Sequence, residues 1–112
     1  MKNYGGITLK DGFRISIQAG ERHYCVPRND TGPWVEVELG FPAWPDKLIE
    51  AFAEDPNNQS ETIYGYVPIS VVQALIIKHG GISEGNLPKF HWTIEQSAKL
   101  AKLLTEMEIK NV

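Results

Sequence analysis

Alternating apolar and polar residues predict a β-hairpin at the start of the chain. Residues 7–9 and 13–18 alternate on either side of a Lys-Asp-Gly turn at residues 10–12. An Asp-Gly pair between such runs is the strongest short-range hairpin signal. Because side chains alternate across a strand, the apolar positions of the second run share one face. The opposite face is directed to solvent or to a polar site and carries Arg14, Ser16 and Gln18.

Two further segments, residues 34–39 and residues 62–67, have the composition of strands. In the first, Glu36 and Glu38 alternate with apolar residues, which places both carboxylates on the outer face. Gly65 in the second indicates a β-bulge or a close approach by another backbone segment. Four strands are therefore expected.

Apolar residues three and four positions apart predict three helices, at about residues 45–54, 68–79 and 93–109. The first begins with a proline, which the first turn of a helix tolerates. The second has an apolar face shared by His79 and is followed by Gly80, which suits a left-handed cap. Its many β-branched residues leave a strand as the alternative.

The last helix has the clearest local signals. Thr93 with Gln96 three residues later forms a capping box, and pairs of opposite charge four residues apart lie on the outer side. Residues 81–92 are expected to be a connector. The expected core face of the last helix consists of Ile94, Ala98, Ala101 and Leu104, with Leu100, Leu103 and Met107 beside it.

These elements predict an α+β fold in which three helices pack on one face of a small, mainly antiparallel, four-stranded sheet. A chain of 112 residues has the usual size of one domain, so residues 1–112 are expected to form a single domain. An open sheet edge can pair with a second copy, which leaves a homodimer or a larger symmetric oligomer open alongside a monomer.

Composition excludes several classes of protein. Apolar residues make up 42% of the chain, too many for a disordered protein, and no apolar run approaches the roughly 18–20 residues of a membrane span. The first residues lack the apolar core of a signal peptide, and a single cysteine cannot form an internal disulfide. We therefore expect a cytoplasmic protein that does not bind membranes.

Charge is unevenly distributed along the chain. Residues 1–33 contain five Lys or Arg against three Asp or Glu, whereas residues 34–66 contain one against seven. Proteins that bind duplex nucleic acid usually carry a dense basic stripe, and none is visible here. Duplex nucleic acid is therefore not an expected partner, and the acidic middle segment is a candidate surface for a basic protein partner.

Most of the unusual chemistry is concentrated in the turn-rich loop of residues 22–34. Arginine binds phosphate or carboxylate through its planar guanidinium, and aromatic rings stack on bases. Tyr24, Trp34, Tyr64 and Tyr66 are either such platforms or core residues, and each arginine is either a ligand contact or a solvated surface charge. The candidate ligand-binding residues are Arg22, His23, Tyr24, Arg28 and Tyr66.

No pattern in the chain predicts catalysis or metal binding. Cys25 lies near His23, but a lone cysteine is more often a small buried residue than a nucleophile. The three histidines lack the close spacing of zinc ligands. We therefore expect a protein that is not an enzyme and that uses no cofactor and no metal; general base catalysis by His23 is a third hypothesis, behind two binding functions.

Several short motifs resemble a family of small uncharacterised proteins encoded by bacteriophages and prophages. They are His-Tyr-Cys-Val-Pro-Arg at 23–28, Gly-Pro-Trp at 32–34, Val-Glu-Leu-Gly-Phe-Pro at 37–42, Ala-Glu-Asp-Pro at 53–56, Tyr-Gly-Tyr-Val-Pro at 64–68 and Lys-His-Gly-Gly at 78–81. The resemblance spans roughly residues 12–82 and implies a phage origin without assigning any catalytic residue.

Small phage proteins of this size are often similar in role to anti-defence factors of the host-cell cytoplasm. By that context, the resemblance implies either a sponge that sequesters a nucleotide-like or other anionic signal, or an anti-CRISPR-like inhibitor of a defence protein. Loop 22–34 is the candidate site for the first role, and the acidic segment from Glu36 to Glu61 is the candidate surface for the second.

Overall fold

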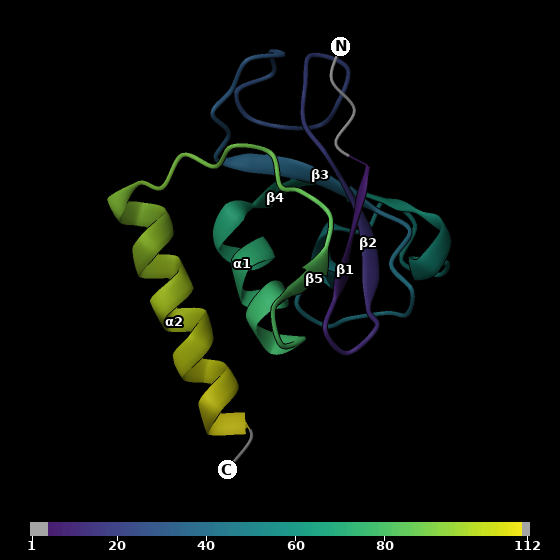
Figure 1. The fold of residues 1–112 in the computed structure, drawn as a ribbon, viewed down its shortest axis with the longest axis vertical. Coiled ribbons are helices and arrows are strands. Elements are labelled where there is room, and N and C mark those ends of the chain that lie inside the picture. Colours follow the sequence, from purple (N-terminus) through teal and green to yellow (C-terminus); the bar gives the residue numbers. More distant parts are fainter. Residues whose placement is uncertain (1–4, 111–112) are drawn as a thin grey trace.

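The computed structural model describes residues 5–110 of the chain, with side chains through Met107. In this part five strands form one antiparallel sheet in the order β4-β3-β2-β1-β5 (Figure 1). The predicted α+β class and antiparallel sheet are confirmed, but the predicted number of four strands is wrong. The strands are β1 (Gly6–Leu9), β2 (Arg14–Gln18), β3 (Glu36–Gly40), β4 (Ile63–Pro68) and β5 (Ile82–Glu84).

The additional strand, β5, lies in the segment that was expected to be a connector. It has three residues, too few for an alternating pattern to stand out in the sequence. Its partner is β1, with Thr8 opposite Glu84 and Leu9 opposite Ile82. Pairing with the edge of the β1–β2 hairpin therefore makes this segment a strand.

The β1–β2 hairpin forms as predicted. Gly12 has a φ of 95°, and the Asp11 carboxylate accepts the backbone N–H of Phe13 at 3.0 Å, so both turn residues contribute. The apolar side chains of the hairpin are buried beneath α1, whereas Arg14 on the opposite face is exposed. The polar outer face expected from the alternation is therefore present.

Two of the three predicted helices are confirmed. α1 (Ile69–Lys78) covers one face of the sheet, and α2 (Ile94–Lys110) lies alongside α1 (Figure 1). The strand alternative for residues 68–79 is excluded, and Gly80 follows α1 with a φ of 90°. Neither of these described helices has the length and apolar content that crossing a bilayer requires.

The helix predicted at residues 45–54 is wrong. This part of the β3–β4 connection consists of turns and the short 3-10 helix η1 (Glu50–Phe52), and a second one, η2 (Gln59–Glu61), follows. Asp46 accepts the backbone N–H of Leu48 through its carboxylate at 2.9 Å, a local bond that competes with helical hydrogen bonding. Its carboxylate is also held by Lys78, the last residue of α1, and by His79, which follows it, and these contacts fix the turn.

The predicted core face of α2 is wrong at three of its four residues, because only Leu104 is half-buried. Ile94 is 92% exposed, and Ala98 and Ala101 are exposed as well. The side of the helix that packs against α1 contains buried Gln96 and the half-buried residues Leu100, Leu103 and Met107, which were expected to lie beside the core face. Both sides of α2 have helical periodicity, and the larger side chains face the protein because they remove more apolar area from water.

Gln96 contributes hydrogen bonds to the N-termini of both helices. Thr93 caps α2 by accepting the backbone N–H of Gln96 at 3.1 Å, which confirms the N-cap half of the predicted capping box. The Gln96 side chain then accepts the N–H of Ser70 in the first turn of α1, at 3.3 Å. Gln96 therefore satisfies an N–H that α1 itself leaves without a partner.

A mostly buried ionic cluster links the hairpin turn, the β3–β4 connection and the end of α1. The two ring nitrogens of His79 contact the carboxylates of Asp11 and Asp46, and Lys78 contacts Asp46 at 3.1 Å. Phe13 stacks on the His79 ring with centroids 4.3 Å apart. Because each ring nitrogen faces a carboxylate, the geometry is fully satisfied when both nitrogens carry protons.

The contacts in this cluster lower the pKa of both carboxyl groups, Asp11 and Asp46. Burial alone would raise the pKa of Asp46, but hydrogen bonds from the Leu48 N–H, His79 and Lys78 outweigh it and hold that pKa below its usual value. The hydrogen bond from His79, followed by that from the Phe13 N–H, lowers the pKa of Asp11. Both groups therefore favour the folded state when they are ionised.

The edge of the sheet formed by β4 is less open than expected. Residues 53 and 54 pair along β4, where the Glu54 N–H donates to the carbonyl of Ile63 at 2.9 Å.

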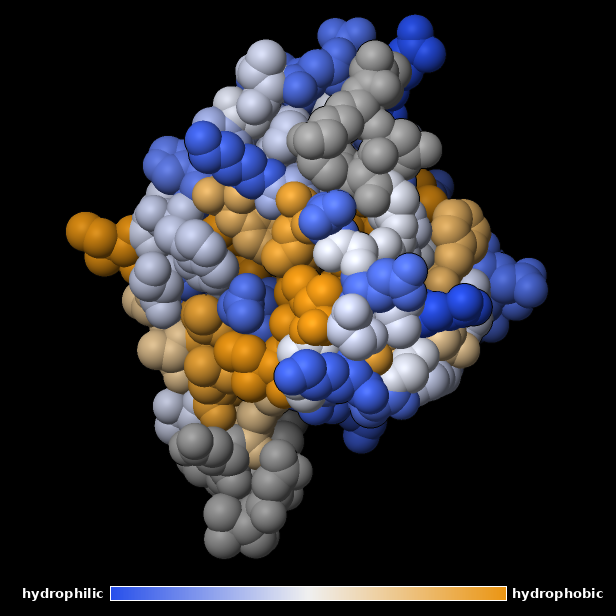
Figure 2. Space-filling view, in the orientation of Figure 1, coloured by the Kyte–Doolittle hydropathy of each residue, from blue (hydrophilic) through white to orange (hydrophobic). Residues whose placement is uncertain are grey.

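Figure 2 shows apolar side chains gathered over α1 between α2 and β5. Ile77 of α1 is 46% exposed. The expectation of a homodimer or larger oligomer stays a prediction.

Candidate functional site

Glu38 fastens the start of loop 22–34 to the outer face of the sheet. Its carboxylate lies 3.1 Å from Nδ1 of His23 and accepts the backbone N–H of Tyr24 at 3.1 Å. The Tyr24 carbonyl in turn accepts the backbone N–H of Tyr66 on β4 at 3.0 Å. The loop is thus held on β3 and β4, and the Glu38 carboxylate orients the His23 ring.

A β-bulge in β4 brings a second tyrosine to the loop. Opposite β3 the pairing register shifts between Val37 and Leu39, so β4 contains an extra residue at this point. Tyr66 adopts a positive φ of 53°, and its ring centroid lies 5.7 Å from that of Tyr24. Tyr66 is 44% exposed and Tyr24 is 41% exposed, so both residues present surface to solvent.

Gly65 explains how Tyr24 approaches the strand. A Cβ at Gly65 would lie 3.2 Å from the Cβ of Tyr24, closer than ordinary contact allows. Of the two alternatives predicted from this glycine, the β-bulge is confirmed, and the group that approaches Gly65 closely is the side chain of Tyr24. Gly32 likewise makes room for a side chain, that of Trp34.

Arg28 completes a cluster with the two tyrosines, which we call the Tyr24–Arg28–Tyr66 patch. Its guanidinium carbon lies 5.4 Å from the centroid of the Tyr24 ring, within the range of cation–π contacts. Nε donates to the carbonyl of Glu21 at 3.1 Å, which orients the group. Within residues 5–110 its terminal nitrogens have no other hydrogen bond, so they are accessible to an anionic ligand.

The structure separates the remaining candidates from this patch. Arg22 is exposed, and no contact joins it to the patch in the described part of the chain. Trp34 and Tyr64 are core residues, 1% and 0% exposed, so the core interpretation holds for them and the surface interpretation for Tyr24 and Tyr66.

Cys25 is a buried structural residue. It is 1% exposed, and its thiol donates to the carbonyl of Gly20 at 3.2 Å. The interpretation as a small buried side chain is confirmed. Among the described residues no group of three or more His, Cys, Asp or Glu is arranged to hold a metal ion.

The acidic middle segment is not one continuous anionic surface. Asp46 is buried within the His79 cluster, and Glu38 is engaged by the loop. The exposed carboxylates of this segment belong to the β3–β4 connection and are those of Glu50, Glu54, Asp55 and Glu61. Asp55 and Glu50 also accept local hydrogen bonds from Asn57, Asn58 and Gln59.

Comparison of the chain with protein-family models, with curated proteins and with solved structures found no match. The resemblance to phage-encoded proteins therefore stays a prediction, and the candidate function has to be argued from the geometry of the described residues.

Proposed function

We propose that this protein is a non-enzymatic binder of a nucleotide-like or other anionic aromatic small molecule, and that it acts in the host-cell cytoplasm as a phage anti-defence factor. The observation that supports binding is the Tyr24–Arg28–Tyr66 patch, in which an arginine and two half-exposed rings share one surface. The phage context rests on the resemblance alone.

The patch offers complementary contacts to the two halves of a nucleotide. The terminal nitrogens of Arg28 suit a phosphate, for which guanidinium groups form paired, charge-assisted hydrogen bonds. Tyr24 and Tyr66 suit the base, because stacking on an aromatic side chain contributes about 1–3 kcal/mol per base. His23 lies beside the patch and is held by Glu38, so its role is to position the loop.

A thermal-shift assay tests the proposal. A ligand that binds only the folded state stabilises it by about 2.7 kcal/mol at a hundredfold excess over Kd, which for a domain of this size raises Tm by roughly 10 °C. The probes are a panel of linear and cyclic nucleotides. If none of them changes the Tm of the wild-type protein, nucleotide binding is refuted.

Substitutions locate the site. Arg28→Ala is expected to remove the ligand-dependent shift while leaving the ligand-free Tm nearly unchanged, because an exposed arginine contributes little stability. Arg22→Ala is expected to reduce the shift only weakly, since Arg22 acts through its charge without joining the patch. Lys47→Ala, another exposed cation, is the control and should retain the full shift.

The second candidate function is inhibition of a basic host defence protein through the exposed carboxylates of the β3–β4 connection. Reversing the charge of Glu50 and Glu54 is then expected to abolish inhibition, whereas Arg28→Ala is expected to be silent. Glu38 is unsuitable for this test, because its reversal would release the loop. The two sets of variants therefore separate the two functions.

A further inference from the structure

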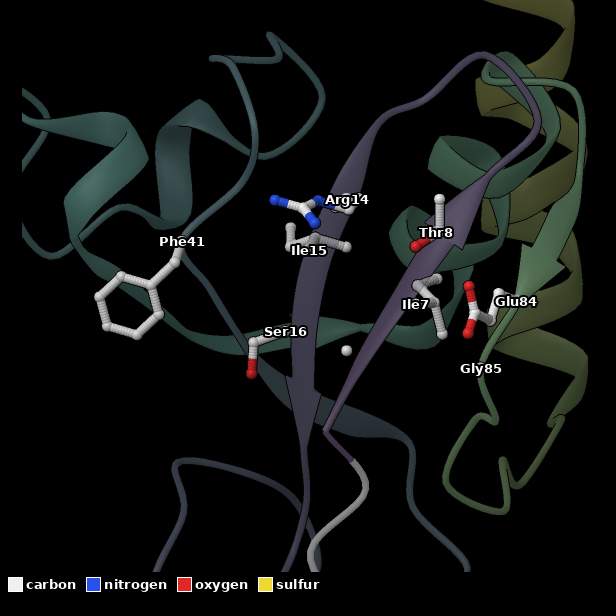
Figure 3. A pocket seen from close by; sticks show the side chains of 9 residues that line it. Ile7, Thr8, Arg14, Ile15, Ser16, Phe41, Glu84 and Gly85 are labelled. Carbon is white, nitrogen blue, oxygen red and sulfur yellow. The ribbon is translucent and has the colours of Figure 1, made fainter.

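A hollow on the outer face of the sheet lies apart from the residues of the proposed patch. It has a volume of about 500 Å³, is open to solvent and is lined by β1, β2, β5 and Phe41 (Figure 3). This volume is within the range of small-molecule sites, about 300–1,000 Å³. In the register of the sheet, Ser16 pairs with Gly6 on one side and Gly40 on the other, so its row lacks flanking side chains.

Two opposite charges border this hollow. Thr8 pairs with both Arg14 on β2 and Glu84 on β5, so the two charged residues lie two strand spacings apart, about 10 Å between their Cα atoms. Figure 3 shows the Glu84 carboxylate directed from β5 toward β1 and the Arg14 guanidinium standing off β2 on the side of Phe41. Both residues are exposed, and within residues 5–110 neither side chain forms an ion pair or hydrogen bond.

Phe41 adds an apolar surface at the arginine end. It is 58% exposed, and its φ of 54° is unfavourable for a residue with a side chain. In the described part of the chain only Phe41 and Tyr66 combine a side chain with a positive φ. Strained residues of this kind concentrate at binding sites, and here the strain holds an aromatic ring at the rim of a polar hollow.

We infer that this hollow binds a short zwitterionic peptide, of about three residues, with its carboxylate at Arg14 and its ammonium group at Glu84. An extended chain spans about 3.3–3.6 Å per residue, so three residues match the separation of about 10 Å between the Cα atoms of Arg14 and Glu84. Thr8 pairs with both charged residues and therefore lies between the two ends, where its hydroxyl group suits the peptide backbone. Ser16 borders the hollow two residues from Arg14 on β2, and Phe41 suits an apolar C-terminal side chain. The Glu84 carboxylate disfavours nucleotides, which carry several negative charges.

An NMR titration with the tripeptide Ala-Ala-Leu tests this inference. Saturable shifts of the Thr8 and Ser16 amides are expected, and N-acetylation or C-amidation of the peptide should each weaken binding by about tenfold, since each removes one charge pair. The absence of saturable shifts up to about 10 mM peptide, the weakest range of specific affinity, would overturn the inference. Shifts confined to the Tyr24–Arg28–Tyr66 patch would overturn it as well.

Charge-neutralising variants identify which end each residue holds. Arg14→Gln should bind the free acid and the C-amide equally, and Glu84→Gln should bind the free amine and the N-acetyl form equally. Lys10→Gln, on the same hairpin but outside the hollow, should titrate as the wild type does, and so should Arg28→Ala, because the patch is a separate site. If Arg14→Gln or Glu84→Gln has an amide spectrum of the intact fold and still binds the free peptide end better than the blocked end, the assignment of that residue to that end is overturned.

Discussion

Replacing Asp46 by Asn is expected to destabilise the protein more than the same replacement at Asp11, the other carboxylate of the ionic cluster. The Asp46 side chain is 2% exposed and accepts hydrogen bonds from His79 Nε2 at 2.8 Å, Lys78 Nζ at 3.1 Å and the Leu48 N–H at 2.9 Å. An amide in this position offers one acceptor where the carboxylate offers two. One N–H donor of the cluster would then face another donor.

The expected loss follows from how buried the cluster is. Removing one partner of a buried ion pair typically costs about 3–5 kcal/mol, because the other charge stays buried without compensation. Lys78 is 41% exposed and can turn to water, so we expect the lower end, about 3 kcal/mol. At about 4 °C per kcal/mol, Tm should fall by roughly 12 °C.

The assay compares the free energy of unfolding in urea for the wild type, Asp46→Asn and Asp11→Asn. Asp11 contacts the same histidine, but its side chain is 44% exposed, so water replaces the lost contact and the decrease should be much smaller. An equal decrease for both variants, or a decrease for Asp46→Asn below about 1 kcal/mol, the scale of one ordinary hydrogen bond, would refute the argument from burial.

Three other changes have defined outcomes. Because the pKa of Asp46 is lowered in the folded state, the free energy of unfolding of the wild type should decrease as pH falls below the usual carboxyl pKa of 3.8 and through the folded-state pKa. Urea titrations at several pH values should show a smaller decrease at acid pH for Asp46→Asn, and an equal decrease for both proteins would contradict this. Gln96→Ala should lower the free energy of unfolding by about 1 kcal/mol, since the N–H of Ser70 loses its partner, and an unchanged urea midpoint would exclude the cap. Gly65→Ala should displace Tyr24 and weaken the nucleotide-dependent Tm shift, whereas a full shift would mean that the ring position is unimportant.

Elements whose signals are local could be predicted from the order of residues alone. The Asp-Gly turn and the alternation on either side of it specify the β1–β2 hairpin, because the turn geometry and the side-chain period of two are properties of neighbouring residues. The periodicity of residues 69–78 likewise specified α1, and the concentration of Arg28 and Tyr24 in one loop specified part of the candidate site.

Contacts between distant residues decided the rest. Residues 45–54 have helical spacing, yet Asp46 is held by Lys78 and His79, which lie more than thirty residues away in the chain. Periodicity alone does not say which side of α2 meets α1, and a three-residue strand exists only because β1 offers it a partner. Tyr66 joins Tyr24 because a bulge in β4 turns it toward the loop, whereas Trp34, within the same loop, enters the core. Exposure and proximity are properties of the packed chain, so they separate the solvent-exposed aromatic residues Tyr24 and Tyr66 from the core residue Trp34 only once the chain is folded.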